Sequence, residues 1–484
     1  MRLSSLIASN EGIRYDGPDL DITGLTQDSR KAKPGSLFIA TPGTKLDGRA
    51  FVDDAIKNGA SAILAPEGFS CAAPTLLTHD MRRATAAFAA AFYPRQPETI
   101  VAVTGTSGKT STAQFAREIW QALGHQSASI GTLGLVTAEG TSYGSLTTPD
   151  AITLHHLLDD CAEQGITHAA LEASSHGIEL HRLDKVRLKA GGFTNLSRDH
   201  LDYHQTMEAY FKAKLRLFEE LLPVRAAAVL NADSDMFPVL RDTAQKRGLE
   251  IIAYGKEGAD LRLIEAQPDA RGQILKLEVF GRKHEVLLPV IGGFQAWNAL
   301  CAAGLAIGSG ADSDAVIGAL GKVSGVPGRM QFIGTSAKGG AVFVDYAHKP
   351  DALDNVLQAM RPHVAAQKAK LGVIFGCGGN RDAGKRPIMG EIAARLADFT
   401  IVTDDNPRNE DAATIRAAVL AGCRDKANVT EIGDRARAIA AGIEKLGAGD
   451  VLIIAGKGHE PGQTVGDRVL PFDDAEEARK VLGL

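Results

Sequence analysis

Aromatic residues, cysteines and long apolar runs are all scarce in this chain of 484 residues. Aromatic residues make up 5% of the sequence, which argues against an all-β sandwich, because strands of that class favour aromatic side chains. The five cysteines are odd in number and far apart, so we expect a reducing compartment rather than a disulfide scaffold or a zinc ribbon. No apolar run approaches the roughly 20 residues of a membrane span, and the N-terminal segment MRLSSLIASN lacks the pattern of an export signal.

An excess of positive charge is missing as well. The formal net charge is −5, so no bulk positive field is available to hold nucleic acid or an anionic membrane, and neither is expected as a partner. Hydrophobic residues at 44% and charged residues at 23% are typical of soluble globular proteins. At roughly 100–200 residues per domain, the length suggests about two to four domains. Together these features favour a cytoplasmic, multidomain α/β enzyme.

Glycine is abundant, with 52 residues, and many of them stand where an apolar run meets a helical pattern, as at strand-to-helix turns. The alternation indicates three domains, 1–98, 99–327 and 328–484. The first contains a helix predicted over 81–92 and ends in a Pro-containing linker at 93–97. Strands are predicted at 99–103, 168–171, 191–195 and 226–230 in the second domain, and at 341–344, 371–375, 399–403 and 451–455 in the third. Such alternation predicts mostly parallel sheets with right-handed crossovers.

A Gly-rich turn follows the strand predicted at 99–103. It comprises Gly105, Thr106, Ser107, Gly108, Lys109, Thr110 and Ser111, and it leads into a helix predicted over 109–123. Small residues let backbone N–H groups approach phosphate oxygens, and the helix N-terminus adds partial positive charge. Lys109 can reach the β- and γ-phosphates, and the Thr110 hydroxyl can ligate Mg²⁺. The turn therefore predicts a phosphate loop, although Val103 stands where the usual pattern has glycine.

Acidic and histidine residues follow two further strands. Glu172 comes directly after the strand at 168–171, and His200 follows the strand predicted at 191–195. Ligands gather at the carboxyl ends of strands in an open parallel sheet, so Glu172 is placed to ligate the metal that accompanies the phosphates. A His200 ligand would indicate a second ion, Mg²⁺ or Mn²⁺. The His200–His204 spacing would also suit zinc on a helix, but no Glu follows His200 as in metalloproteases.

Taken together, these motifs resemble the Mur ligase family, whose members use ATP to form amide bonds in peptidoglycan precursors. The resemblance covers essentially the whole chain. It includes Asp28-Ser29-Arg30, the phosphate loop, Thr147-Thr148-Pro149, Glu172 to Gly177, Asn195 to His204, Asn298, Gly328 to Met330, Val344 to His348, Gly376 to Asp382 and Ala455 to Glu460. It implies an α/β protein of three domains: an N-terminal UDP-binding α/β domain, a central P-loop ATPase domain with a parallel sheet, and a C-terminal Rossmann-like domain.

The tetrapeptide Asp405-Asn406-Pro407-Arg408 refines the resemblance. In the family it marks members that add meso-2,6-diaminopimelate to UDP-N-acetylmuramoyl-L-alanyl-D-glutamate, whereas relatives that take L-lysine carry a different tetrapeptide. The planar guanidinium of Arg408 can pair bidentately with a carboxylate. Diaminopimelate has a distal carboxylate that lysine lacks, so an arginine buried for that carboxylate would stay unpaired with lysine and penalise it.

The resemblance also implies a role for each matched position. ATP would bind to the phosphate loop, Asn298, Arg329, Asp345 and His348. The muramoyl-dipeptide would bind to Ser29, Thr147, Thr148, Ser174 and Arg182. Diaminopimelate would bind to Arg381, Asp405, Asn406, Pro407, Arg408, Gly456 and Glu460. Lys109, Glu172, His200 and Lys214 would be catalytic, with Thr110, Glu172 and His200 as metal ligands. Leu180 stands where many such members carry glutamine, a departure that concerns one polar substrate contact and not the reaction.

Lys214 lies in a segment similar to the one in which the family carries a carbamylated lysine, on a helix predicted over 206–222. An amine captures carbon dioxide only when it is neutral, and nearby Mg²⁺ ions would lower its pKa and hold the carbamate. The product is an anion that could help to bind a second Mg²⁺. The alternative is a solvated lysine like its neighbours Lys212 and Arg216.

The implied reaction passes through an acyl phosphate of the D-glutamate γ-carboxylate, which the amine of diaminopimelate then attacks, leaving ADP and phosphate. The expected cofactors are ATP and two Mg²⁺ ions, with Mn²⁺ as a substitute. The expected partners are the small-molecule substrates alone, bound by a cytoplasmic monomer.

Three alternatives stay open. The same reaction could use L-lysine. A ligase similar to folylpolyglutamate synthase would also extend a glutamate γ-carboxylate, but the 405–408 tetrapeptide and the additional N-terminal block argue against it. A P-loop switch protein would bind nucleotide without forming an amide, and the many polar motifs outside the loop argue against that function.

Overall fold

The computed structural model describes residues 1–43, 46–142, 144, 146–269, 272–366, 368–423 and 427–484. The chain divides into two compact units. The first consists of Met1–Leu263, Glu278–Arg282 and Trp297–Ala319, and the second of Ile264–Leu277, Lys283–Ala296 and Leu320–Leu484. The three domain boundaries expected from the sequence stay predictions. No helix in the described part of the chain combines the length and the apolar character needed to span a bilayer.

The first unit begins with a five-stranded sheet of order β1-β5-β4-β3-β2. Its strands are β1 (Ile13–Arg14), β2 (Gly24–Thr26), β3 (Ser36–Ile39), β4 (Ala60–Pro66) and β5 (Thr75–Thr78), with helices α1 (Leu3–Ala8), α2 (Val52–Lys57) and α3 (Met81–Phe92). β2 to β5 pair in parallel, and β1 joins the edge antiparallel. The Asp80 carboxylate caps α3 by accepting the N–H groups of Arg82 and Arg83, which confirms the helix predicted over 81–92.

An eleven-stranded sheet follows, of order β16-β15-β14-β13-β12-β11-β6-β10-β7-β8-β9. The strands are β6 (Thr99–Thr104), β7 (Ser127–Gly131), β8 (Gly134–Val136), β9 (Thr141–Ser142), β10 (His168–Glu172), β11 (Leu188–Phe193), β12 (Ala227–Asn231), β13 (Glu250–Gly255), β14 (Leu261–Asp269), β15 (Gly272–Val279) and β16 (Arg282–Leu288). β7, β10, β6, β11, β12, β13 and β14 are joined by parallel pairs, whereas β8 and β9 are antiparallel. All six residues of β6 are buried, as a central parallel strand requires.

Two boundaries in this sheet region differ from the prediction. β11 begins at Leu188 and ends at Phe193 rather than running over 191–195, because Asn195 leaves the sheet and hydrogen bonds to the phosphate loop. The helix expected over 206–222 is α8 (Met207–Arg216) followed by a π-helical segment, Leu217–Leu221. Leu222 is extended before Pro223, as the ring of a following proline demands.

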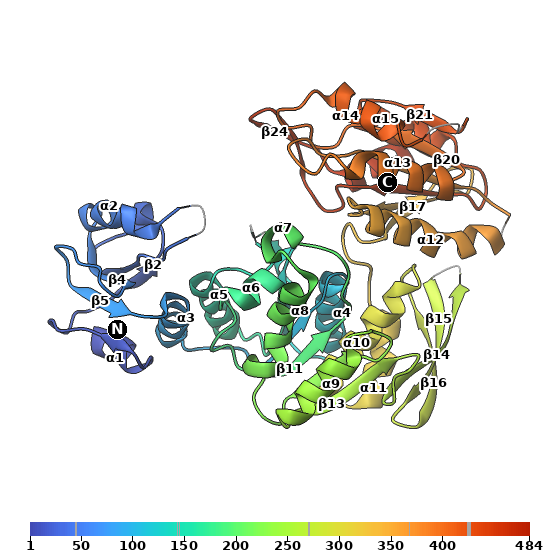
Figure 1. Cartoon of the computed structure of the whole chain (residues 1–484). Helices are drawn as coiled ribbons and strands as arrows, with labels where there is room; N and C mark the ends of the chain where they lie inside the picture. The colour runs from blue at the N-terminus through green and yellow to red at the C-terminus, as the bar shows by residue number, and fades with distance from the viewer. Residues whose placement is uncertain (44–45, 143, 145, 270–271, 367, 424–426) are drawn as a thin grey trace. The chain divides into compact units, whose positions relative to one another are not determined.

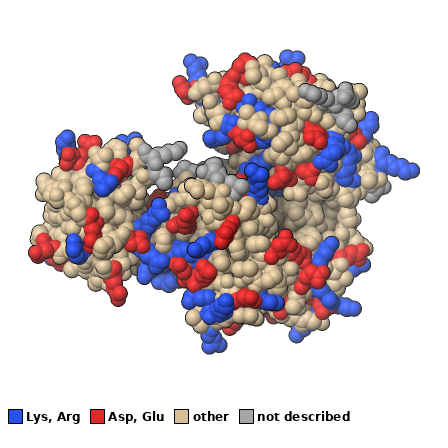
Figure 2. Space-filling model, in the orientation of Figure 1, with Lys and Arg blue, Asp and Glu red and all other residues tan. Residues whose placement is uncertain are grey.

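The other helices assigned to this part of the chain are α4 (Lys109–Ala122), α5 (Ala151–Glu163), α6 (Ser175–Glu179), α7 (Leu201–His204), α9 (Phe237–Lys246), α10 (Phe294–Gly308) and α11 (Ser313–Ala319). Strands β14 to β16, which the alternating pattern did not predict, extend the sheet at one edge (Figure 1). On the face drawn in Figure 2, acidic and basic side chains are interspersed, in keeping with the net charge of −5.

The second unit is built on a six-stranded sheet of order β17-β18-β22-β19-β20-β21. Its strands are β17 (Gln331–Thr335), β18 (Ala341–Asp345), β19 (Leu371–Phe375), β20 (Phe399–Val402), β21 (Val429–Glu431) and β22 (Val451–Ala455), with the hairpin β23 (Gly462–Val465) and β24 (Arg468–Pro471) and the helices α12 (Pro350–Ala366), α13 (Lys385–Leu396), α14 (Ala412–Leu420), α15 (Arg435–Glu444) and α16 (Asp474–Leu482). β17 pairs antiparallel, and the other pairs in the six-stranded sheet are parallel.

Alternate residues of these strands enter two separate cores. Phe343, Val373 and Phe375 pack with residues of α12, α13 and α14. Val344 and Ile374 pack with residues of α15 and α16 on the other face. Because successive strand residues point to opposite faces, the sheet is covered by helices on both sides, which confirms the Rossmann-like prediction.

Candidate functional site

The phosphate loop lies at the carboxyl end of β6. Gly105 (φ +146°) and Gly108 (φ +87°) have backbone conformations that favour glycine. A Cβ at Gly108 would also lie 2.2 Å from Oδ1 of Asn298, so Gly108 and Asn298, both predicted to bind ATP, are adjacent. The Ser107 N–H donates to Oδ1 of Asn195 at 2.9 Å, and the Thr194 hydroxyl donates to the Ser107 carbonyl at 2.6 Å. Contacts with the end of β11 therefore fix the loop.

Two lysines share the carbonyl oxygen of Gly105. Nζ of Lys109 lies 2.8 Å from it and Nζ of Lys214 lies 2.9 Å from it. Lys214 is 1% exposed and its ammonium lies 4.2 Å from the centre of the Tyr210 ring. Burial lowers the pKa of the Lys214 amine well below 10.5, the charge of Lys109 lowers it further, and Asp199 opposes both. The solvated-lysine alternative is therefore wrong for Lys214.

Arg216 is not a solvated residue either. Its side chain is 12% exposed, and its guanidinium donates to both carboxylate oxygens of Asp184 at 2.9 Å and to the Ile178 carbonyl at 2.8 Å. These bonds tie α8, which carries Lys214, to the segment that follows α6. The position of Lys214 is consequently set by its own helix and by this ion pair.

Glu172 ends β10 beside the loop. Its carboxylate accepts hydrogen bonds from the Thr110 hydroxyl at 3.0 Å, the Thr132 N–H at 2.7 Å and the Thr132 hydroxyl at 3.2 Å. Gly131 makes room for it, since a Cβ there would lie 2.1 Å from Oε1 of Glu172. A carboxylate and a hydroxyl at a phosphate loop fit Mg²⁺, which takes few protein ligands and completes its shell with water and phosphate oxygens. Within the described ranges, no group of three or more His, Cys, Asp or Glu could hold a metal by itself.

The two histidines of the zinc alternative have different surroundings. His204 is buried, with Nε2 2.9 Å from the Ser175 hydroxyl and Nδ1 3.3 Å from the Glu179 carboxylate. These contacts hold α7 against α6. The side chain of His200 is 45% exposed, 3.5 Å from Asp199, and its ring packs edge-on against His176 at 5.1 Å. His200 is therefore the more accessible of the two and better placed to act as a ligand.

Four of the five residues expected to bind the muramoyl-dipeptide form one group. The Thr147 and Thr132 hydroxyls are 3.2 Å apart, the Thr148 hydroxyl lies 2.7 Å from the Glu172 carbonyl and 2.9 Å from the Ser174 hydroxyl, and Arg182 donates to the Thr148 carbonyl at 2.7 Å. Burial lowers the pKa of the Arg182 guanidinium. The fifth, Ser29, lies in a 3₁₀ turn (Ser29–Lys31) of the N-terminal region, buried, and its carbonyl accepts from Asn58.

Arg329, Asp345 and His348, predicted for ATP, gather in the second unit. The guanidinium of Arg329 lies 4.4 Å from the centre of the Tyr346 ring. The Asp345 carboxylate accepts the N–H groups of Met330 and Ala347, at 2.7 and 2.8 Å; burial raises its pKa, which Arg329 opposes. Burial lowers the pKa of His348 to about 4, so this ring is neutral at neutral pH.

The tetrapeptide 405–408 lies beside Glu460. Asn406 donates to the Glu460 carboxylate at 3.0 Å, and Arg408 donates to the Gly379 carbonyl at 2.9 Å. Oδ1 of Asp405 is buried without a hydrogen-bond partner among the described residues, 3.9 Å from Nζ of Lys457. Burial raises the pKa of Asp405, which Arg435 and Lys457 oppose. Pro407 is buried, Gly456 (φ +118°) is near Asp405, and Arg381 is exposed.

Several residues of these sites were not predicted. Thr132, which directly follows the neighbouring strand β7, holds Glu172, and no local sequence motif marks it. Tyr210 covers Lys214 and could have been found, since it lies four residues earlier on the same helix face. Two buried groups support the 405–408 tetrapeptide. One is Lys457, which is fully buried. The other is the ion pair of Arg435 with Asp474, in which both side chains are 0% exposed.

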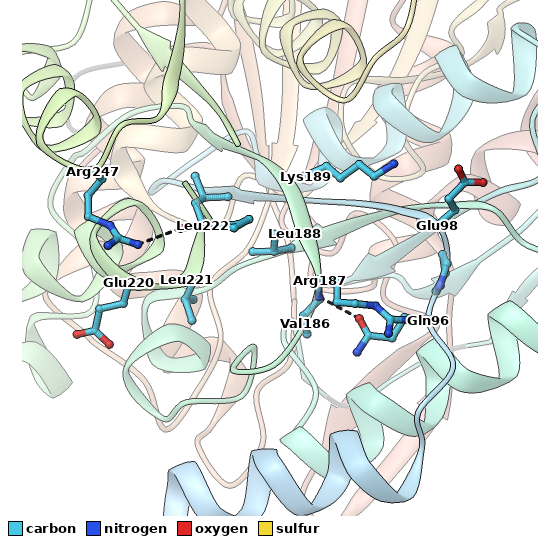
Figure 3. A pocket seen from close by; sticks show the side chains of 12 residues that line it. Gln96, Glu98, Val186, Arg187, Leu188, Lys189, Glu220, Leu221, Leu222 and Arg247 are labelled. Carbon is cyan, nitrogen blue, oxygen red and sulfur yellow. Dashed lines mark hydrogen bonds between the residues drawn. The ribbon is translucent and has the colours of Figure 1, made fainter. Parts of the chain in front are cut away.

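A cavity of about 700 Å³ lies away from these groups, at the amino ends of β6, β11 and β12 (Figure 3). Its lining includes Leu188, Leu222 and the cationic Arg187, Lys189 and Arg247. None of the predicted site residues lines it. The phosphate loop, by contrast, follows the carboxyl end of β6.

Comparison with known proteins agrees with this arrangement. Three family models match: "Mur ligase family, catalytic domain" at residues 21–93, "Mur ligase middle domain" at 103–306 and "Mur ligase, glutamate ligase domain" at 328–458. A UDP-N-acetylmuramoyl-L-alanyl-D-glutamate–2,6-diaminopimelate ligase of Bradyrhizobium diazoefficiens is 53% identical over 489 residues, 100% of this chain and 99% of the relative. The chain belongs to the Mur ligase family. The ligase of the same description from Caulobacter vibrioides is 51% identical over 95% of both chains.

Solved structures of the family have the same fold. A structure of UDP-N-acetylmuramoyl-L-alanyl-D-glutamate–2,6-diaminopimelate ligase superposes with a TM-score of 0.75 at 34% identity, over 100% of this chain and 99% of that one. A folylpolyglutamate synthase of Mycobacterium tuberculosis complexed with ADP has a TM-score of 0.62 at 17% identity and covers 78% of this chain and 91% of its own. The second likeness concerns the fold alone.

Proposed function

We propose that the protein is the ATP-dependent ligase that adds meso-2,6-diaminopimelate to UDP-N-acetylmuramoyl-L-alanyl-D-glutamate during peptidoglycan precursor synthesis. The observation that carries this proposal is the full-length similarity, at 53% identity, to a ligase of that description. The tetrapeptide 405–408 beside Glu460 supports diaminopimelate over L-lysine. The protein acts in the cytoplasm as a monomer whose partners are its small-molecule substrates.

The first half of the reaction takes place at the phosphate loop. Lys109 and the loop N–H groups bind the triphosphate of ATP, with Asn298, Arg329, Asp345 and neutral His348 at the other ATP positions. Thr110 and Glu172 would hold one Mg²⁺ ion, and His200 with carbamylated Lys214 a second, or Mn²⁺ in their place. These ions, when bound, neutralise phosphate charge. Burial lowers the pKa of the Lys214 amine and so favours its neutral form, the form that captures carbon dioxide.

The chemistry then proceeds in two displacements. Thr147, Thr148, Ser174 and Arg182 hold the muramoyl-dipeptide while an oxygen of the D-glutamate γ-carboxylate attacks the γ-phosphorus and ADP leaves. Positioning and charge stabilisation suffice for this step. The neutral amine of diaminopimelate attacks the acyl phosphate carbonyl, and the tetrahedral intermediate loses phosphate and a proton to give the amide.

The second substrate is recognised by charge. Arg408 pairs with the distal carboxylate of diaminopimelate, and Arg381 is the other arginine of the predicted diaminopimelate-binding residues. Asp405, whose buried Oδ1 has no hydrogen-bond partner in the described part of the chain, and Glu460 accept the ammonium group. L-lysine as a substrate has no distal carboxylate, so Arg408 would stay unpaired. A site built for that ion pair penalises such a substrate strongly.

A coupled assay tests the proposal. Purified protein receives ATP, Mg²⁺ and the UDP-muramoyl-dipeptide, with meso-diaminopimelate or L-lysine in parallel, and ADP and the tripeptide are measured. We expect tripeptide with diaminopimelate only. Tripeptide with lysine would shift the substrate to the L-lysine alternative, and nucleotide hydrolysis without any tripeptide would favour the switch protein and contradict the proposal.

A further inference from the structure

The hairpin β23–β24 packs against the tetrapeptide 405–408 although the proposed reaction gives it no part. β23 and β24 pair antiparallel from Gly462 with Pro471 to Val465 with Arg468. Arg408 forms a parallel bridge with Val465. The Arg408 N–H donates to the Thr464 carbonyl at 3.0 Å, and the Gly466 N–H donates to the Arg408 carbonyl at 2.8 Å. The backbone of Arg408 is thus bonded on both sides to the hairpin.

The other residues of the tetrapeptide are bonded to the same hairpin. The Thr464 N–H donates to Oδ1 of Asn406 at 2.8 Å, and Nε2 of Gln463 donates to the Asp405 carbonyl at 2.6 Å. The buried ammonium of Lys457 donates to the Gly462 carbonyl. Three of the four residues of the tetrapeptide are therefore hydrogen bonded to the hairpin.

Arg408 depends on this hold. Its φ is +51°, in the left-handed region that a residue with a Cβ avoids. The guanidinium is aimed at the Gly379 carbonyl, and a Cβ at Gly378 would lie 2.8 Å from its Nη1. If the hairpin bonds were lost, the backbone could return to an ordinary φ, and the guanidinium would leave this position.

We propose that hairpin β23–β24 is a specificity element that clamps Arg408 in its left-handed conformation and so sets the preference for diaminopimelate over lysine. This inference rests on the proposed function. Gln463 and the backbone of Thr464 are positioning groups: they act through Asp405, Asn406 and Arg408. An unclamped Arg408 would be solvated by water, and the penalty against lysine would shrink.

Two substitutions test the clamp. Gln463→Glu keeps the size of the side chain but replaces the donor to the Asp405 carbonyl with an acceptor. Thr464→Pro removes the N–H that bonds Asn406, and Thr464→Val, which keeps that N–H, is its matched control. The exposed turn variant Asp467→Asn is the control for charge on the hairpin.

In both test variants we expect the ratio of kcat/KM for diaminopimelate to that for lysine to fall by about tenfold, through KM for diaminopimelate. KM for ATP and the melting temperature should stay at the wild-type values, and both controls should match wild type. An unchanged ratio, or a parallel rise of KM for every substrate, would overturn the clamp.

The structure of the Thr464→Pro variant provides a readout that does not depend on turnover. Thr464 also accepts from the Arg408 N–H, so displacing this residue from Asn406 should break that bond too. We expect Arg408 to leave the left-handed region, whereas retention of its φ near +51° would overturn the clamp. A wild-type protein that makes no tripeptide would overturn the proposed function instead, and the variant structure would still decide the conformational claim.

Discussion

The phosphate loop and the tetrapeptide 405–408 differ in the groups that accept hydrogen bonds from their buried basic side chains. At the loop, Lys109 and Lys214 both donate to one neutral acceptor, the Gly105 carbonyl. At the tetrapeptide, Arg435 makes two 2.7 Å bonds to the carboxylate of Asp474 with both side chains 0% exposed. The first arrangement suits a site that receives a highly anionic ligand, and the second suits a rigid frame around a zwitterionic one.

The largest effect on activity is expected at the loop. Replacing Lys109 with Ala removes the cation that we propose faces the transferred phosphoryl group, so the rate of ADP formation should fall by about a thousandfold. The measurement is ADP release dependent on the muramoyl-dipeptide. Lys212→Ala, which removes an exposed lysine of α8, is the matched control and should be neutral. ADP release at the wild-type rate in Lys109→Ala would show that the loop does not bind the triphosphate.

The largest effect on stability is expected at the frame of the second site. Arg435→Met leaves the buried Asp474 carboxylate unpaired, and we expect the unfolding transition of this unit to lose about 3–5 kcal/mol. Urea unfolding followed by circular dichroism measures it. The double variant Arg435→Met/Asp474→Leu should recover most of the loss, and the exposed Arg437→Ala should cost less than about 0.5 kcal/mol. Wild-type stability in the single variant would mean that the pair does not organise this unit.

The variant Arg408→Ala tests whether Arg408 recognises the amino-acid substrate or supports the fold. Because its guanidinium is paired mainly with carbonyl groups, its loss should leave folding intact but lower kcat/KM for diaminopimelate by about a hundredfold. KM for ATP should change by less than about twofold, since the change removes a contact to one substrate only. Arg437→Ala is again the control. An equal loss for ATP and diaminopimelate would assign Arg408 to the fold rather than to the amino acid.

The two sites also differ in how far the sequence predicts them. The phosphate loop is contiguous from Gly105 to Ser111 and follows a buried strand, so its position and shape follow from local pattern. Thr132 escapes such reasoning because it meets Glu172 through the β7–β10 pairing, and the order of strands in a sheet is not a local property. The role proposed for each site residue stays a prediction.

The hairpin β23–β24 shows the same limit in the second unit. Its residues are half-buried or exposed, and β24 is exposed throughout, so no apolar alternation announces it. The tetrapeptide was recognisable by family resemblance, but the left-handed Arg408 was not, because an arginine carries no signal for positive φ. What holds it comes from residues about 60 positions later, through contacts that only the fold brings together.

The smallest predicted effect tests the buried amine of Lys214 at the loop. Burial lowers the pKa of Lys214 in the folded state, so folding favours the neutral amine and the unfolded chain binds the proton more tightly. Stability should therefore rise with pH between the lowered folded pKa and the ordinary value near 10.5. Lys214→Met should stabilise the protein at pH 7 by about 1 kcal/mol, with the advantage shrinking toward pH 10.

The comparison must be made in buffer freed of carbon dioxide, because carbamylation would replace the amine with a different group. Urea unfolding at several pH values measures it, with Lys212→Met as the exposed control. With ¹³C-labelled bicarbonate added, a carbamate signal should appear in wild type and be absent from Lys214→Met. A wild type that is more stable than Lys214→Met at pH 7 would mean that the Gly105 carbonyl and Asp199 fully compensate the ammonium. The proposed contrast between the phosphate loop, whose lysines await an anionic ligand, and the tetrapeptide 405–408, whose nearby Arg435 is already paired with Asp474, would then not hold.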